Sequence, residues 1–166
     1  MDSIDKFNKL SKAEFISIFR NIFEKTEWIA ERCYESKPYN NLDELVSKMM
    51  KIFENIEKER HLEILNSHPD LAVEKKLTED SKNEQKKASL NQCTDEEFVE
   101  FKKLNEKYKK KFGFPFIIAV KGKNKEEILN NFRQRITNNI DTEFNEAINQ
   151  VKKIASLRLN EITKIT

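Results

Sequence analysis

Glycine and proline are scarce in this chain, with only two glycines and three prolines among its 166 residues. Tight hairpin turns depend on both, because glycine adopts positive φ angles and proline presets the first half of a turn. Their scarcity disfavours a sheet of hairpins and favours helices joined by short polar links. No repeat, linker or low-complexity tract divides the sequence. We therefore expect an all-α fold, a helical bundle formed as a single domain over residues 1–166.

Four capping-box patterns, or their asparagine variant, mark expected helix starts. They begin at Ser11, Asn41, Ser81 and Thr94. After the first two, apolar residues recur at helical spacing as far as Phe23 and Ile56, and the same spacing predicts helices over residues 60–66, 125–136 and 142–162. The helix over residues 60–66 must stop before His68, because Pro69 disfavours helical geometry in the residue that precedes it.

One apolar segment interrupts the Lys-, Glu- and Asn-rich sequence, from Phe112 to Val120. It carries no charge, and Gly113 and Pro115 within it oppose helix formation. We expect a buried extended loop over about residues 112–121, whose backbone amides need hydrogen-bond partners in the interior. Such a loop is suited to the wall of a pocket.

Charges of both signs are interspersed, 31 basic and 29 acidic residues, which gives a formal net charge of +2. A nucleic-acid module that uses the face from Lys102 to Lys111 is a weak alternative, because these lysines fit the solvated end of a helix. No apolar stretch is long enough for a membrane span, and the N-terminus lacks a signal-peptide pattern. We expect a cytoplasmic protein without nucleic-acid or membrane partners.

Motifs for nucleotide, zinc-protease and serine-hydrolase chemistry do not occur in the sequence. Cys33 and Cys93 have neither disulfide-framework nor metal-ligand spacing, which favours two free thiols. We expect neither a metal nor a cofactor, so any reaction would rely on acid–base groups and electrostatics.

Arg158 falls within the apolar stripe of the helix expected over residues 142–162. In one interpretation its stem packs in the core while the guanidinium reaches solvent or pairs with a buried carboxylate. In the other it is an anion clamp, because a planar guanidinium grips a carboxylate at two points. The residue's position alone leaves both open.

Two further places carry groups suited to chemistry. His68, at the exit of a helix, has an imidazole whose usual pKa suits proton transfer near neutrality, although a lone histidine is more often structural; His61 is the weaker candidate. Ser81 and Glu84 fit a helix cap, and with Gln85 they also fit a ligand site at a helix N-terminus. The two readings of that segment use the same geometry.

Five motifs occur in one collinear order and together resemble the OHCU decarboxylase family over about residues 10–163. The motifs are Ser67-His68-Pro69-Asp70-Leu71-Ala72, Leu77-Thr78-x-x-Ser81-x-x-Glu84-Gln85, Phe101-x-x-Leu104-Asn105-x-x-Tyr108, Phe112-Gly113-Phe114-Pro115-Phe116 and Ile154-Ala155-x-x-Arg158-Leu159. The resemblance implies an all-helical carboxy-lyase of urate catabolism that needs no cofactor. Its expected reaction converts 2-oxo-4-hydroxy-4-carboxy-5-ureidoimidazoline to (S)-allantoin.

The resemblance also assigns roles to individual residues. It implies that His68 donates the proton and that Glu84 and Arg158 complete the catalytic set. The implied substrate-binding residues are Pro69, Ser81, Lys82, Asn83, Glu84, Gln85, Arg158 and the main chain of Phe116, Ile117, Ile118, Ala119 and Val120. Further implications are a homodimer and a functional link to urate oxidase and hydroxyisourate hydrolase. The alternative is a non-catalytic helical binding module, and the presence of both His68 and Arg158 favours the enzyme.

Overall fold

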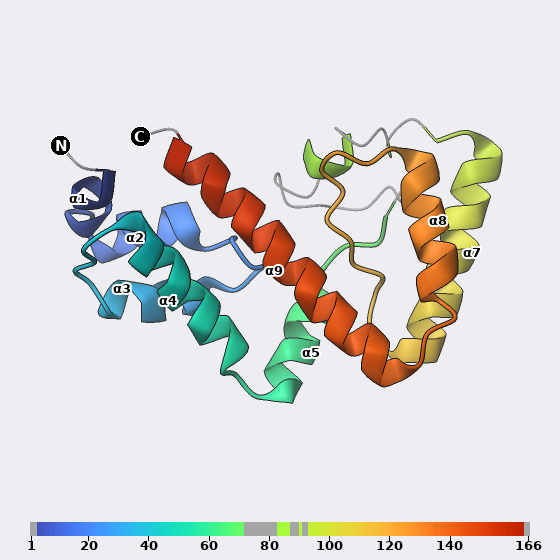
Figure 1. The fold of residues 1–166 in the computed structure, drawn as a ribbon, viewed down its shortest axis with the longest axis horizontal. Helices are drawn as coiled ribbons and strands as arrows, with labels where there is room; N and C mark the ends of the chain where they lie inside the picture. The colour runs from blue at the N-terminus through green and yellow to red at the C-terminus, as the bar shows by residue number, and fades with distance from the viewer. Residues whose placement is uncertain (1–2, 72–82, 87–89, 91–92, 165–166) are drawn as a thin grey trace. The chain divides into compact units, whose positions relative to one another are not determined.

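The computed structural model describes residues 3–71, 83–86, 90 and 93–164. Within these ranges the regular secondary structure is helical and no strand occurs, so the prediction of an all-α fold is confirmed. The helices, labelled in Figure 1, are α1 (Ser3–Asn8), α2 (Lys12–Phe19), α3 (Glu27–Glu35), α4 (Leu42–Glu54), α5 (Lys58–Ser67), α7 (Asp95–Phe112), α8 (Lys125–Arg135) and α9 (Ile140–Lys164). Residues 83–86 add one helical turn. The predicted helix start at Ser81 and the predicted site residue Lys82 lie outside the described residues.

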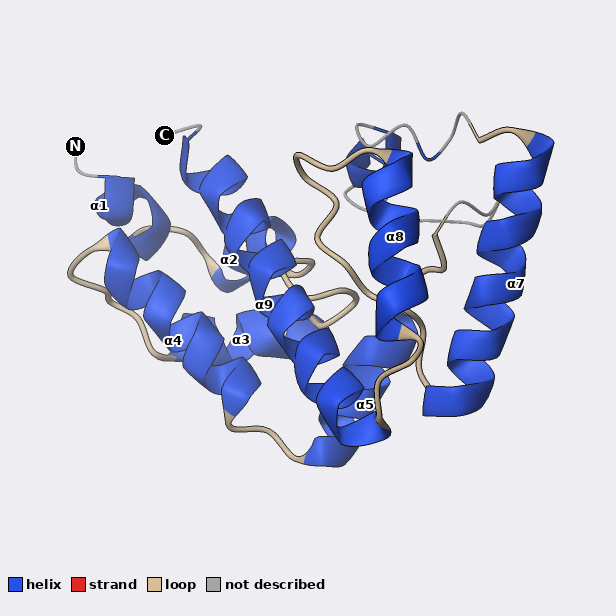
Figure 2. Cartoon of the chain, turned by 45° about the vertical axis from the view of Figure 1, so that its right-hand side comes forward, coloured by secondary structure: helices blue, strands red, loops and turns tan. Residues whose placement is uncertain are grey.

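The chain divides into two compact units, one formed by residues 1–64 with 152–166 and the other by residues 65–151. The first unit contains α1 to α4, and the second contains α7 and α8, which lie side by side in Figures 1 and 2. The single domain over residues 1–166 stays a prediction.

Three of the predicted helix starts are confirmed. The side chains of Ser11, Asn41 and Thr94 each accept a hydrogen bond from the backbone N–H three residues further on. The capping box is reciprocal at Ser11 and Thr94, where the glutamate also accepts from the cap's own N–H. Such caps stabilise a helix by about 1 kcal/mol each. Helix α5 ends at Ser67, as the proline at position 69 predicted.

Helix α2 ends at Phe19, so the predicted continuation to Phe23 is wrong. The Asn21 side chain accepts a hydrogen bond from the Lys25 N–H, and the Thr26 hydroxyl donates to the carbonyl of Phe23. These local bonds compete with helical ones and stabilise a turn. Ile22 and Phe23, in the turn that follows α2, are nevertheless buried. Helix α4 also ends earlier than predicted, at Glu54 rather than Ile56.

The apolar loop begins where Gly113 ends α7. Gly113 has a φ of 81°, in the left-handed region that favours glycine, and its N–H donates to the carbonyl of Lys109. The non-helical segment that follows is buried from Phe114 to Val120, so the predicted buried loop is confirmed. This loop connects α7 to α8, and in both Figure 1 and Figure 2 it lies on the opposite side of α8 from α7.

Aromatic rings fix the loop within the core of the second unit. The ring centroid of Tyr108 lies 4.5 Å from that of Phe112, 5.4 Å from Phe116 and 5.8 Å from Phe132. Phe116 and Phe132 stack with centroids 3.9 Å apart. Each such pair contributes about 0.5–1.5 kcal/mol beyond its buried area, so the loop's first half is strongly anchored.

No helix among the described residues is both long enough and apolar enough to cross a membrane.

The two cysteines differ in burial, and we expect them to differ in reactivity. Burial raises the pKa of the Cys33 thiol to about 11, against the lowering effect of its contact with Tyr39, whereas Cys93 is partly exposed. Because the thiolate is the reactive form, Cys33 should react with Ellman's reagent on the order of 10²-fold more slowly than Cys93. A Cys93→Ser variant isolates Cys33; its rapid labelling in the folded protein would contradict this prediction.

Candidate functional site

His68 and Pro69 form the corner that follows α5. The His68 N–H donates to the carbonyl of Leu65 at 3.2 Å, which closes the last turn of the helix, and both side chains are half-buried. The next residue, Asp70, is buried, and its Oδ2 lies 2.5 Å from Nζ of Lys109 on α7. Asp70 therefore links the corner to α7 two residues after His68, the predicted proton donor.

Two side-chain amides also hold this corner. The Gln85 Nε2 donates to the carbonyl of Asp70 at 3.4 Å, and the Asn105 Nδ2 donates to the carbonyl of Leu71 at 3.1 Å. Gln85 belongs to the helical turn 83–86, which also carries the half-buried Glu84 and the exposed Asn83. The structure therefore brings the predicted residue Gln85 to the segment beside Pro69.

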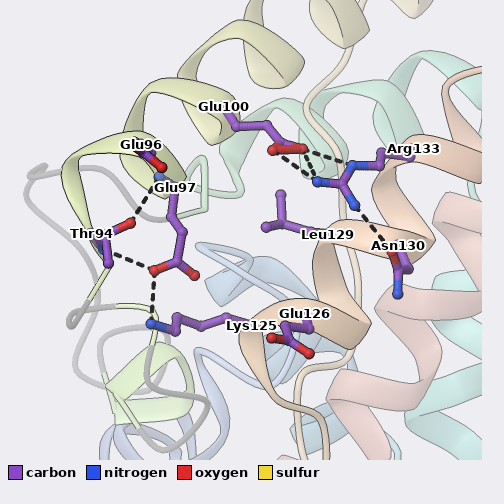
Figure 3. A pocket seen from close by; sticks show the side chains of 9 residues that line it. All are labelled: Thr94, Glu96, Glu97, Glu100, Lys125, Glu126, Leu129, Asn130 and Arg133. Carbon is purple, nitrogen blue, oxygen red and sulfur yellow. Dashed lines mark hydrogen bonds and ion pairs between the residues drawn. The ribbon is translucent and has the colours of Figure 1, made fainter.

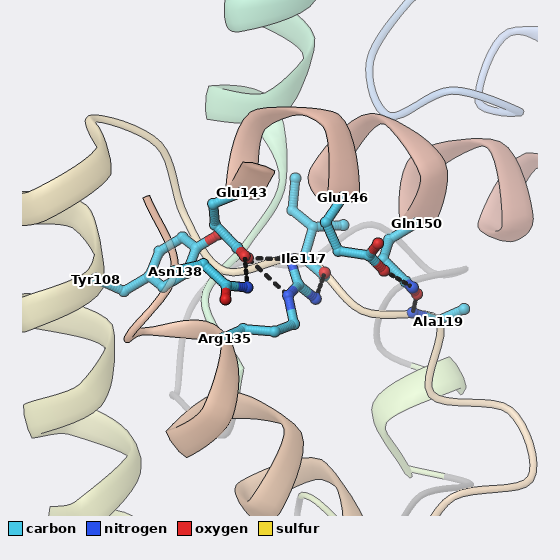
Figure 4. Close-up of polar contacts among 8 residues, drawn as sticks. All are labelled: Tyr108, Ile117, Ala119, Arg135, Asn138, Glu143, Glu146 and Gln150. Atoms are coloured by element: carbon cyan, nitrogen blue, oxygen red, sulfur yellow. Dashed lines mark hydrogen bonds and ion pairs between the residues drawn. The ribbon is translucent and has the colours of Figure 1, made fainter. Parts of the chain in front are cut away.

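The loop 116–120 receives polar partners from α8 and α9. The Arg135 Nη1 donates to the carbonyl of Ile117 at 2.6 Å, and the Ala119 N–H donates to Oε1 of Gln150 at 2.9 Å (Figure 4). These bonds supply partners that the buried backbone requires. They also connect the predicted binding loop to residues that the sequence motifs did not single out.

The carboxylate of Glu143 accepts hydrogen bonds from three side chains near this loop. Glu143 is fully buried, and its Oε1 accepts from the Tyr108 hydroxyl at 2.5 Å and from the Arg135 Nε at 2.6 Å. The Asn138 Nδ2 donates to Oε2 at 3.1 Å. Burial, together with the bond to Glu143, raises the pKa of the Tyr108 phenol, so the phenol remains a donor to the carboxylate. Glu143 thereby fixes the orientation in which the Arg135 guanidinium donates to the Ile117 carbonyl.

Arg158 lies in the first unit, where only 6% of its surface is exposed. Its Nη2 donates to Oε2 of Glu24 at 2.9 Å, and its Nη1 donates to the carbonyl of Asn21 at 2.8 Å. Glu24 is itself only 1% exposed. Of the interpretations left open for Arg158, the structure shows pairing with a buried carboxylate, and its role as a substrate clamp stays a prediction.

A surface hollow of about 700 Å³ lies between α7 and α8, and its lining includes none of the predicted site residues (Figure 3). Two ion pairs lie in this lining. Lys125 Nζ lies 3.0 Å from Oε1 of Glu97, and the Arg133 guanidinium contacts both carboxylate oxygens of Glu100. Among the described residues, no three His, Cys, Asp or Glu side chains lie close enough together to hold a metal ion.

Comparison with known proteins identifies close relatives along nearly the whole chain. The sequence profile of the OHCU decarboxylase family matches residues 8–160. The chain is 36% identical to the 2-oxo-4-hydroxy-4-carboxy-5-ureidoimidazoline decarboxylase of Haloferax volcanii, over 96% of this chain and 95% of that protein. It is 41% identical to the uric acid degradation bifunctional protein of Bacillus sp. (strain TB-90), over 98% of this chain but only 32% of that longer protein.

Solved structures agree with the sequence comparison. A crystal structure of (S)-allantoin synthase matches with a TM-score of 0.78 and 28% identity, over 98% of this chain and 54% of that chain. A crystal structure of OHCU decarboxylase in the presence of (S)-allantoin matches with a TM-score of 0.73 and 25% identity, over 88% and 96% of the two chains. Because the family profile matches residues 8–160 and the Haloferax volcanii relative matches over nearly its full length, the chain belongs to the OHCU decarboxylase family.

Proposed function

We propose that this chain decarboxylates 2-oxo-4-hydroxy-4-carboxy-5-ureidoimidazoline to (S)-allantoin in urate degradation. The observation that carries the proposal is the match to the Haloferax volcanii decarboxylase over nearly the full length of both proteins. The bifunctional relative, which is named for uric acid degradation, supports a functional link to urate oxidase and hydroxyisourate hydrolase. A homodimer and a cytoplasmic location remain part of the proposal.

The substrate carries its own electron sink. Its carboxylate lies on the carbon next to a C=N bond, and that bond accepts the electron pair released when CO2 leaves. The protein has to orient the carboxylate, stabilise the enol-like product and deliver one proton to one face of the ring. Side chains and backbone amides suffice for these three tasks, so neither a metal nor an organic cofactor is required.

In this mechanism His68 delivers the proton. The contacts that Lys109, Gln85 and Asn105 make with the segment after Pro69 restrain the backbone beside the imidazole. This restraint supports proton transfer, because the rate depends on a fixed position of the proton donor relative to the reacting carbon. Glu84, in the turn that also carries Gln85, orients or polarises the hydroxyl end of the substrate.

Arg158 binds the substrate's carboxylate in this proposal, and an Arg158→Lys variant tests that role. Lysine keeps the charge and can still pair with Glu24, but it lacks the planar fork that binds a carboxylate at two points. We expect KM to rise by about tenfold or more, with a small change in thermal unfolding midpoint. Arg133→Lys, at the exposed pair with Glu100, is the matched control and should leave KM unchanged. An unchanged KM in Arg158→Lys would remove the clamp from the mechanism.

The activity is tested by supplying the labile substrate in situ, from urate with urate oxidase and hydroxyisourate hydrolase. The optical rotation of the allantoin formed is then followed with and without this protein. Rapid accumulation of dextrorotatory (S)-allantoin is the expected result. Slow decay to racemic allantoin at the uncatalysed rate would contradict the proposal and favour a binding module.

A further inference from the structure

The two polar groups of loop 116–120 that contact the helices belong to alternate residues. The carbonyl of Ile117 accepts from Arg135, and the N–H of Ala119 donates to Gln150 (Figure 4). In extended backbone the polar groups of successive residues point to opposite sides, so those of residues 117 and 119 share one side. The polar groups of Ile118, between them, then point to the other side.

Gln150 is held so that only one end of its amide faces the loop. Its Nε2 donates to Oε1 of Glu146 at 2.7 Å, one helical turn away, and its Oε1 accepts from the Ala119 N–H. A carboxylate accepts hydrogen bonds and does not donate them, so Glu146 fixes the NH2 end of Gln150 toward itself. The carbonyl end is thereby committed to Ala119, and Gln150 is only 7% exposed.

The buried backbone N–H groups of Phe116, Ile117, Ile118 and Val120 have no hydrogen-bond partner within the part of the chain that the structure describes. Among them, only that of Ile118 lies between the two groups that the helices hold. Buried backbone donors are nearly always paired, because an unpaired one is costly. A donor held in this way is suited to meet an oxygen of a bound ligand.

We infer that Gln150 is a positioning residue for the loop 116–120. Arg135, held by Glu143, positions the same loop at Ile117. By engaging the helix-facing groups of Ile117 and Ala119, these residues fix the loop so that the Ile118 N–H is the donor presented to a substrate oxygen. The inference rests on the proposed function, because it concerns the loop that binds the substrate there.

A Gln150→Leu variant removes the acceptor for Ala119 at nearly constant side-chain volume. We expect KM for the substrate generated in situ to rise by about tenfold, with kcat changed much less, because substrate positioning is lost while the proton donor is kept. The exchange Glu146→Gln with Gln150→Glu restores both hydrogen bonds with donor and acceptor roles reversed between the two helix positions, and should return KM to near the wild-type value. Gln134→Leu, at an exposed position of α8, is the control and should change neither constant.

A merely structural role for Gln150 predicts a lower unfolding temperature with an unchanged KM in the folded enzyme. That result in Gln150→Leu would overturn the inference, and so would a KM that stays raised in the exchanged pair while its unfolding temperature recovers. Failure of the wild-type chain to turn over the substrate would instead contradict the proposed function, so the two failures are distinguishable.

Residue-resolved amide hydrogen exchange tests the assignment of Ile118 directly, with (S)-allantoin as the probe. The Ala119 amide should exchange slowly with and without allantoin, because Gln150 protects it. The Ile118 amide should slow by about tenfold or more when allantoin saturates the site. An unchanged Ile118 rate at saturation, or a response confined to Ala119, would overturn the inference.

Discussion

His68→Asn should lower kcat by about 10²- to 10⁴-fold while the protein stays folded. Asparagine is polar and similar in size, but it has no group that titrates near neutrality and therefore cannot deliver the proton. The named contacts that hold the corner are made by Asp70 and Leu71, so the backbone there should survive the change. Turnover is measured with substrate generated in situ, and folding is checked by circular dichroism.

His61→Asn is the matched control, because the chain has only two histidines. The His61 Nε2 lies 2.8 Å from the carbonyl of Phe53, and its ring packs edge-on against the Phe53 ring at 5.0 Å. These contacts indicate a structural role, so His61→Asn should lower stability without lowering turnover per folded molecule. Near-wild-type turnover by folded His68→Asn would remove His68 from the mechanism.

The parts of the fold that could be predicted from sequence are those set by contacts within a few residues. At Ser11 and Thr94 the whole cap is made by a side chain and an amide three positions apart, so the spacing of residue types reveals the helix start. Helix α3 was not predicted because its N-cap, Thr26, makes no side-chain capping bond. The turn after Phe19 was missed because neither glycine nor proline marks it.

The apolar stripe of α9 that contains Arg158 also contains two other buried polar residues. Positions 143, 147, 150, 154 and 158 follow helical spacing, so Glu143 and Gln150 lie on the same stripe as Arg158. Reading every polar residue on that stripe as a buried group in need of a partner would have found both. The structure shows that both residues are buried.

The partners of these buried groups could not be predicted in the same way. Glu24 lies 134 positions before Arg158, and Gln150 lies 31 positions after Ala119. Pairing across such separations is set by how helices pack, which residue spacing within one helix does not encode. Residue types and motifs therefore predicted His68 and the apolar loop as parts of the candidate site. The contacts that Lys109, Asn105 and Gln150 make with these segments are seen only in the structure.

Glu143→Ala should lower the free energy of unfolding by about 3–5 kcal/mol, because it leaves a buried cation without its counter-charge. Arg135 is 7% exposed and contacts Glu143 through Nε, and the Tyr108 hydroxyl loses its acceptor as well. Urea unfolding followed by circular dichroism measures the change. Glu100→Ala is the matched control, since Glu100 also pairs with an arginine of α8 but at the surface, and it should cost about 0–1 kcal/mol.

The double variant Glu143→Leu with Arg135→Leu separates the buried charge from the lost contacts. Removing both partners eliminates the uncompensated cation, so the double variant should be more stable than Glu143→Ala alone. It also removes the donor to the Ile117 carbonyl, so catalysis should remain impaired even where stability recovers. An unfolding free energy of Glu143→Ala within about 1 kcal/mol of wild type would show that the pair contributes little to stability. If the double variant recovers stability but not KM, then Glu143 is required for folding stability and Arg135 for positioning the loop.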